Sequence, residues 1–346
     1  MAAKRPPCIR HWRDLEGAPE NTHPATGEAR GFTSDFGKAT GLTRLGVRHH
    51  RLPPGRRSSP PHAERDEEEL VIVLRGEPDL WQDGYLYRLK PGVAVCWPDR
   101  TGIAHSLINN SKNDVQFLTI GEASRYNSAV AFPKDPKIAE WFAGHGKLWP
   151  DPPRRRLGPH DGQPGEGAKT SRKPGLPPNA IDTVIVTIQT GNSYPNDTEL
   201  MADFIPLNDR SGLGRIGGGI DLLNPGRRTS YPHAEGDEEE FTYVVSGAPE
   251  VWLDGRIWPL QPGDFVGWPS GTGQAHTVLN NTDQMVVLAT FGEASRRRSR
   301  VWYPFHRKHA KTLGERAWTP SPLPKLGPHG GLPDALRKSK RKKSAS

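Results

Sequence analysis

The stretch from Pro61 to Leu74 reads PHAERDEEELVIVL, in which a histidine and five acidic residues lead directly into an apolar run. A short run rich in valine, leucine and isoleucine after a polar segment predicts a β-strand. A charged segment in front of a strand is usually a solvated turn. The stretch therefore raises the question of whether its acidic side chains face solvent or surround a site.

The same stretch occurs a second time in the chain. Pro232 to Val245 reads PHAEGDEEEFTYVV, at an offset of 171 positions. Without a gap, this offset also pairs His105 with His276 and extends to the GEASR segments that begin at Gly121 and Gly292. Two copies of a unit this long indicate two complete domains, since a solenoid requires several short repeats.

The repeat divides the chain of 346 residues into segments. We expect a first domain with an N-terminal arm at residues 1–166 and a Pro- and Gly-rich linker at 167–178. A second domain follows at 179–335, and residues 336–346 form a basic, disordered tail. Two domains of ordinary size are also what the chain length favours.

The composition favours an all-β protein. Hydrophobic residues make up 34% of the chain, and 38 glycines and 35 prolines indicate many turns and few long helices. In each half, short β-rich runs such as LVIVL, YLYRL and VAVCW alternate with turn residues, which is typical of a sandwich or a small barrel. The best helical candidate, Lys137–Phe142, follows the strands of the first half.

The formal net charge of +8 at pH 7 comes mainly from the RKSKRKK segment that begins at Arg337. This segment is either a solvated tail without a partner or a nuclear-import or polyanion-binding segment. It is the one part of the chain through which nucleic acid could bind, and we give that binding little weight. No run of 18 apolar residues is present, and the N-terminal segment lacks the apolar stretch of a signal peptide. We therefore expect a cytoplasmic protein without a membrane anchor, with a nuclear location left open by the basic segment. Cys8 and Cys96 are the only cysteines, which excludes a disulfide framework.

Two spaced motifs in each half resemble the two motifs of the cupin family. In the first half they comprise Gly55, His62, Glu64, Glu69 and Gly76, followed by Gly92, Pro98, Gly102, His105 and Asn109. In the second half they comprise Gly226, His233, Glu235, Glu240 and Gly247, followed by Gly263, Pro269, Gly273, His276 and Asn280. The resemblance implies an all-β fold of two tandem cupin (jelly-roll-like) β-barrels, with short helices in the segments after each barrel.

The resemblance also implies a divalent metal site in each barrel. In an extended strand, residues i and i+2 face the same way, so the side chains of a His-x-Glu segment project together. The expected metal ligands are His62, Glu64, Glu69 and His105 in the first domain and His233, Glu235, Glu240 and His276 in the second. Two imidazoles and two carboxylates suit a divalent transition metal, with Fe(II) or Mn(II) favoured over Zn, Ni or Co.

One departure from the family leaves an alternative open. Where the family usually has its second histidine, this chain has Glu64 and Glu235. The alternative is that these glutamates mark an abandoned metal site and only decorate a loop. If Glu64 points outward, the other three ligands remain. Arginines just before the ligand strand, at positions 56, 57, 227 and 228, either hold an anionic substrate or are ordinary surface residues.

The fold alone does not select an activity. We expect a metal-dependent bicupin that acts on a small oxygen-rich molecule as a dioxygenase-type oxidoreductase. The alternatives are a cupin isomerase or decarboxylase, and a non-catalytic protein whose barrels hold a small molecule or a structural ion. Beyond the ligands no catalytic residue is assigned, and association of chains into a homo-oligomer is left open.

Overall fold

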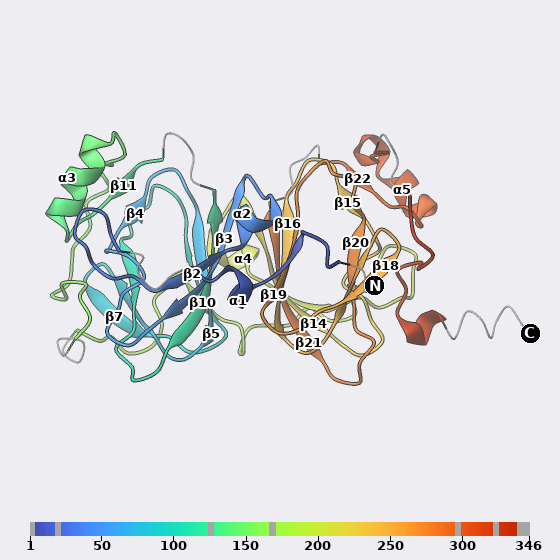
Figure 1. Ribbon diagram of the computed structural model, residues 1–346, viewed down its shortest axis with the longest axis horizontal. Helices are drawn as coiled ribbons and strands as arrows, with labels where there is room; N and C mark the ends of the chain where they lie inside the picture. The colour runs from blue at the N-terminus through green and yellow to red at the C-terminus, as the bar shows by residue number, and fades with distance from the viewer. Residues whose placement is uncertain are drawn as a thin grey trace, which may run out of the picture.

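The structure is a computed structural model that describes residues 4–17, 22–123, 128–165, 171–294, 299–320 and 325–337. Two β-rich halves lie side by side along the long axis of the molecule (Figure 1). The basic segment from Lys338 onward and residues 167–170 of the expected linker lie outside the described residues.

Each half consists of one large and one small antiparallel sheet. In the first half, the large sheet contains β2 (Phe32–Asp35), β3 (Leu45–Leu52), β5 (Glu69–Arg75), β8 (Val93–Trp97) and β10 (Val115–Glu122). The small sheet contains β6 (Asp79–Gln82), β7 (Tyr85–Arg88) and β9 (His105–Ile108). Side chains from both sheets, such as Val71, Leu80 and Leu107, pack into one apolar cluster, so the sheets form the two layers of a barrel-like core.

The second half repeats this arrangement. Its large sheet contains β13 (Asp203–Pro206), β14 (Ile216–Leu223), β16 (Glu240–Ser246), β19 (Asp264–Trp268) and β21 (Val286–Glu293). Its small sheet contains β17 (Glu250–Leu253), β18 (Arg256–Pro259) and β20 (His276–Leu279). In each half, a two-stranded ribbon joins the ligand segment to the chain that follows the barrel: β4 (Ala63–Glu64) with β11 (Val130–Ala131), and β15 (Ala234–Glu235) with β22 (Val301–Trp302).

The helices are short and mostly lie outside the sheets. As expected, a helix follows each barrel: α3 (Pro136–Gly144), which includes the predicted stretch, and α5 (Arg307–Thr312), which continues into the 3-10 turn η2 (Gly314–Arg316). Helices that the sequence analysis did not predict precede the barrels: α1 (Trp12–Leu15), α2 (Phe36–Thr40) and α4 (Asn208–Ser211). The all-β class with short helices is thus confirmed. Among the described helices, even α3 has only 9 residues, too few to cross a lipid bilayer.

The two halves exchange their outermost strands. β1 (Ile9–His11) pairs with β19 of the second half, with Ile9 opposite Val266. β12 (Ala180–Asp182) pairs with β8 of the first half, with Ala180 opposite Val95. Both pairs obey the same offset of 171, so each large sheet gains its sixth strand from the other half's arm. The expected domain boundaries at 166 and 179 stay predictions, and backbone pairing crosses them in both directions.

A single apolar cluster joins the two large sheets. Phe36 of the first half stacks on Phe265 of the second, with ring centroids 4.5 Å apart, and both side chains are fully buried. His49 lies in the same region, with its ring 4.5 Å from that of Trp12 and 6.3 Å from that of Tyr243. Burial of one such aromatic side chain stabilises the fold by roughly 1.5–3 kcal/mol. The interface between the halves is therefore a core in its own right.

The sequence LGPH occurs after each barrel, at residues 157–160 and 326–329, and both copies dock on the hairpin turns of the small sheets. The Gly158 amide donates to the Asp83 carbonyl at 2.7 Å, and the Trp81 indole donates to the His160 carbonyl at 3.1 Å. Gly84 in this turn has φ +84°, and a Cβ added there would lie 2.4 Å from the Gly158 nitrogen. Glycine is therefore required at this turn by both its backbone conformation and the close approach.

Candidate metal centres

Three of the predicted ligands come together in each half. His105 begins β9 and forms a reciprocal pair of backbone hydrogen bonds with His62, at 2.8 and 3.2 Å, while Glu69 begins β5. One ligand atom from each of these residues lies within 4.8 Å of the others, and His105 Nε2 is 3.4 Å from Glu69 Oε2. The strand pairing therefore places residues that are far apart in the sequence around one point.

The second half repeats this cluster with His233, Glu240 and His276. His276 Nε2 lies 3.2 Å and His233 Nε2 3.5 Å from Glu240 Oε2. Both clusters thus consist of two imidazoles and one carboxylate that share a small volume.

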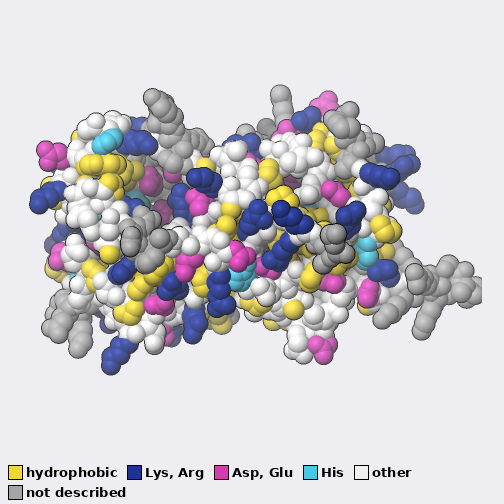
Figure 2. All heavy atoms as spheres, viewed as in Figure 1, with side chains coloured by type: hydrophobic (Ala, Val, Ile, Leu, Met, Phe, Trp, Pro, Cys, Tyr) yellow, Lys and Arg dark blue, Asp and Glu magenta, His cyan; other side chains and the backbone are white. Residues whose placement is uncertain are grey.

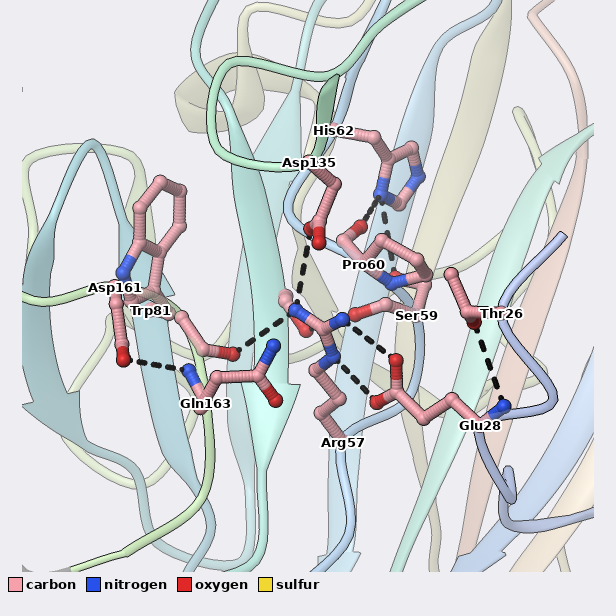
Figure 3. A network of polar contacts seen from close by, with 12 residues as sticks. Thr26, Glu28, Arg57, Ser59, Pro60, His62, Trp81, Asp135, Asp161 and Gln163 are labelled. Carbon is pink, nitrogen blue, oxygen red and sulfur yellow. Dashed lines mark hydrogen bonds and ion pairs between the residues drawn. The ribbon is translucent and has the colours of Figure 1, made fainter. Parts of the chain in front are cut away.

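Backbone carbonyls fix the orientation of the imidazoles. His62 Nδ1 lies 2.9 Å from the Pro60 carbonyl (Figure 3), and His105 Nδ1 lies 3.2 Å from the Ile103 carbonyl. A carbonyl only accepts hydrogen bonds, so each Nδ1 donates and each Nε2 keeps its lone pair for the cluster. The indole of Trp97 stacks on His105 with ring centroids 3.8 Å apart and holds the ring in place.

The equivalent contacts recur in the second half. His233 Nδ1 lies 2.9 Å from the Tyr231 carbonyl, and His276 Nδ1 lies 3.2 Å from the Gln274 carbonyl. Trp268 stacks on His276 at 3.8 Å. Such carbonyl partners are what metal-binding histidines require to present Nε2 to an ion.

The charge states also fit a cation. Burial together with the neighbouring His105 lowers the pKa of His62 to about 4, so this imidazole is neutral near pH 7. Burial opposes ionisation of Glu69, but the adjacent His105, together with His62 and His50, outweighs it and holds the pKa of Glu69 well below its usual range. A neutral imidazole and an ionised carboxylate are the forms that bind metal.

In the second half, the carboxylate of Glu240 instead keeps the imidazole of His233 protonated. Burial disfavours the charged form of His233, but hydrogen bonding to Glu240 and the charges of Glu240 and Glu235 raise the pKa of His233 to about 9. A bound cation would take the place of that proton. The donor set of both clusters therefore fits a divalent transition metal.

The fourth predicted ligand lies at the edge of each cluster. Glu64 Oε1 is 3.7 Å from His62 Nε2, and Glu64 Oε2 is buried without a hydrogen-bond partner among the described residues. Burial and the nearby acidic residues raise the pKa of Glu64 well above its usual value. Glu235 Oε1 lies 3.9 Å from His233 Nε2, and burial and Glu240 raise its pKa to about 8. Each of these buried carboxyl groups therefore requires a proton or a cation.

The acidic stretch does not form a solvated turn. Glu67 accepts a hydrogen bond from the Ser128 hydroxyl, Glu68 binds backbone amides of the second half, and Glu69 belongs to the metal-ligand cluster. The second copy uses its three consecutive glutamates in the same way, beginning with the hydrogen bond from Ser299 to Glu238.

The arginines before the ligand strand have structural partners. Arg57 is 2% exposed, and its guanidinium donates to both carboxylate oxygens of Glu28 at 2.6 Å (Figure 3). Arg228 is fully buried and binds Glu199 in the same way, at 2.6 and 2.8 Å. Both guanidinium groups anchor the N-terminal arm of their domain, so the interpretation that they hold a substrate is not supported for this pair.

A cavity opens in front of each cluster. The first cavity has a volume of about 560 Å³ and is also lined by Arg30, Arg48 and His50. The second has a volume of about 370 Å³ and is also lined by Asp221 and Thr290. None of these residues belongs to the two spaced motifs: Arg30 lies in the arm, Arg48 and His50 on β3, Asp221 on β14 and Thr290 on β21. At the offset of 171, Arg30, Arg48 and His50 stand opposite Met201, Gly219 and Asp221, so differences between the halves would have pointed to these positions.

Comparison with known proteins supports the fold. The model of the family described as "Cupin domain" matches residues 48–121 and 219–291. A search of curated proteins found no match. Several solved structures of oxalate decarboxylase from Bacillus subtilis are similar in fold. A mutant with a two-residue deletion aligns with a TM-score of 0.51 at 16% sequence identity, covering 82% of this chain and 76% of that one.

A second structure of that enzyme concerns the electron paramagnetic resonance of its Mn(II) centres. It aligns with a TM-score of 0.53 at 15% identity and covers 84% of this chain and 78% of that one. Identities this low establish similarity of fold alone.

The face seen in Figure 2 carries basic and acidic side chains interspersed over both halves.

Proposed function

Because the chain contains two cupin domains, each with a cluster of two histidines and one glutamate, we propose that it is a divalent-metal enzyme with one metal centre per domain. In each domain, two imidazole nitrogens and a carboxylate oxygen lie within 4.8 Å of one another at a cavity, and this observation carries the proposal. His62, Glu69 and His105 would hold the first ion, and His233, Glu240 and His276 the second.

The proposed reaction is a dioxygenase-type oxidation of a small oxygen-rich molecule. Two histidines and one carboxylate are the donor set of non-haem Fe(II) oxygenases, and they leave coordination positions open for substrate. When bound, Fe(II) or Mn(II) supplies Lewis acidity and electron transfer to dioxygen. The chain contributes fixed imidazoles, whose Nδ1 atoms are held by carbonyl groups, and the indoles of Trp97 and Trp268, which cover one face of the ligands.

Decarboxylation of a small carboxylic acid is the second candidate function. When a carboxylate leaves as CO₂, the electron pair of the broken C–C bond stays on the remaining carbon and must take a proton. Burial raises the pKa of Glu64, and its carboxyl group lies 3.7 Å from His62 at the cavity, where its protonated form would be placed to donate that proton. The oxalate decarboxylase structures with the same fold also favour this candidate.

Elemental analysis of the purified chain, followed by two gas measurements, tests these proposals. The metal-loaded protein is supplied with hydroxy acids, diketones, catechols and dicarboxylates while dioxygen uptake and CO₂ release are recorded together. Uptake of dioxygen in proportion to substrate supports the dioxygenase, and CO₂ release without uptake supports the decarboxylase. Metal without turnover supports the non-catalytic alternative, and chain without metal would reject a metalloenzyme.

A further inference from the structure

Arg30 and Met201 occupy equivalent places in the two arms. Arg56 donates from Nη1 to the Arg30 carbonyl at 2.6 Å, and Arg227 donates from Nη1 to the Met201 carbonyl at 3.2 Å. The sequence offset of 171 holds for both residue pairs. The backbone of the two arms is therefore anchored alike, while one arm carries a cation where the other carries a thioether.

The Arg30 guanidinium lacks an anion. Its Nε is buried without a hydrogen-bond partner, and its side chain makes no ion pair with any residue that the structure describes. Glu28, the nearby carboxylate, gives both oxygens to Arg57 at 2.6 Å. Burial lowers the pKa of Arg30, since the cation has lost water without gaining a partner. Because Arg30 lines the first cavity, the missing partner can come from a ligand.

At two other positions, the first cavity is lined by a basic residue where the second half has none. His50, whose Nδ1 lies 3.2 Å from the Thr33 hydroxyl, lines the first cavity, and Asp221 stands at its place in the second. Arg48 at the rim of the first cavity is half exposed and lies 3.6 Å from Asp35. Glycine takes the place of Arg48 in the second half. The first cavity thus has two arginines that the second lacks, while six carboxyl groups line the first cavity and four line the second.

We propose that Arg30 binds a carboxylate group of the ligand that occupies the first cavity, and that the second cavity does not bind the same anion. A planar guanidinium matches a carboxylate through two parallel hydrogen bonds. The cavity of about 560 Å³ also reaches His62 and Glu69, so it has room for a small carboxylic acid that extends from Arg30 to the cluster. The inference rests on the proposed function in one respect only, namely that the far end of the acid would meet a metal ion.

Calorimetric titration of the full chain with malonate tests the inference. Arg30→Met introduces the residue of the other half, and we expect malonate affinity to fall about ten- to hundredfold, as for loss of a hydrogen-bonded charge pair. Arg30→Lys keeps the positive charge but cannot form the two parallel hydrogen bonds of a guanidinium, so it should give an intermediate malonate affinity. Arg307→Met removes an equal charge from an exposed position on α5 and should leave malonate affinity unchanged. Malonamide, the uncharged analogue, should bind weakly to every variant.

Equal malonate affinity in Arg30→Met and Arg307→Met would overturn the inference, and so would Arg30-dependent binding of inorganic phosphate without binding of malonate. Thermal melting checks that Arg30→Met is folded, and Arg30→Gln replaces it if it is not. Each titration is run on metal-loaded and metal-free protein. A chain that holds no metal contradicts the proposed function, whereas Arg30-dependent malonate binding in that same metal-free chain would still support this inference.

Discussion

Glu68 and Glu239 occupy equivalent positions in the two repeats, and each carboxylate binds three successive backbone amides of the other half. The Glu68 carboxylate accepts from Gly214, Arg215 and Ile216 at 2.7, 2.8 and 3.1 Å. The Glu239 carboxylate accepts from Thr43, Arg44 and Leu45 at 2.9, 2.9 and 3.0 Å. The middle acid of each acidic stretch therefore joins the halves, while its neighbour on the strand belongs to the metal-ligand cluster.

Glu68→Gln should lower the free energy of unfolding by about 2–4 kcal/mol, because the amide removes the negative charge and turns a donor toward backbone N–H groups. Urea unfolding followed by far-UV circular dichroism measures the change. Glu77→Gln is the matched control, since Glu77 is 52% exposed and lies 3.8 Å from Arg88. Surface ion pairs of this kind contribute little to stability, so we expect Glu77→Gln to lower the free energy of unfolding by about 0.5 kcal/mol or less. Coincident unfolding curves for the two variants would show that Glu68 does not stabilise the interface.

Replacing one metal-ligand histidine in a domain should remove the metal ion of that domain alone. We expect two divalent ions per wild-type chain, one in His62→Ala and none in His62→Ala/His233→Ala, because each cluster then loses one of three close ligands. Mass spectrometry of metals in desalted protein measures the ratio. His145→Ala, at an exposed position, should keep both ions. An unchanged ratio in the double variant would place the metal elsewhere.

The buried His49 should make the protein sensitive to mild acid. Burial and the nearby His50 lower the pKa of His49 from 6.5 to about 3, with His11 and Arg51 adding to the effect. Between pH 6.5 and about 3 the unfolded chain binds a proton here that the folded chain excludes, so stability is full above this window and falls as pH decreases through it. The expected slope from His49 is about 1.4 kcal/mol per pH unit.

Urea unfolding at several pH values measures that slope. His49→Phe removes one titrating group and should reduce the slope between pH 6.5 and 4 by about 1.4 kcal/mol per pH unit. His50 and His62, whose pKa values burial also lowers to about 4, should keep their own contributions. The same change at the exposed His145 should leave the dependence as in wild type. If His49→Phe and wild type lose stability in parallel, His49 is not the group responsible.

Gly84→Ala should displace the segment that docks on its turn. The added methyl group meets the Gly158 backbone at 2.4 Å, and the residue must also hold φ +84°, so we expect a loss of about 3 kcal/mol. Gly55 has φ +70° with no atom within 4 Å of an added Cβ, and Gly55→Ala should cost only about 1 kcal/mol. Limited proteolysis near Gly158 distinguishes the two, with faster cleavage expected in Gly84→Ala alone.

The fold and the centre of each site could be predicted from the sequence because they depend on local patterns. The alternation of apolar runs and turns defined the strands, and the doubled motif brought His62, Glu69 and His105 into one set. The strand partner of a three-residue segment such as Ile9–His11 has no local signature, since its pairing depends on where the other half lies. For the same reason, the sequence does not show which backbone amides the Glu68 carboxylate binds. Arg30 was missed because the nearby carboxylate of Glu28 pairs with Arg57 instead, which only the packing of the arm reveals.

The reciprocal pairing of β1 with β19 and of β12 with β8 determines how the stability of such a barrel depends on protein concentration. A chain with a single repeat could complete its sheet only by borrowing an arm from a second molecule, so its assembly would be a second-order reaction that dilution reverses. In the tandem chain both arms are tethered to the sheets they complete, at an effective concentration set by the connecting segment rather than by the solution. Cleaving that connection would therefore leave the contacts intact while making assembly sensitive to dilution again.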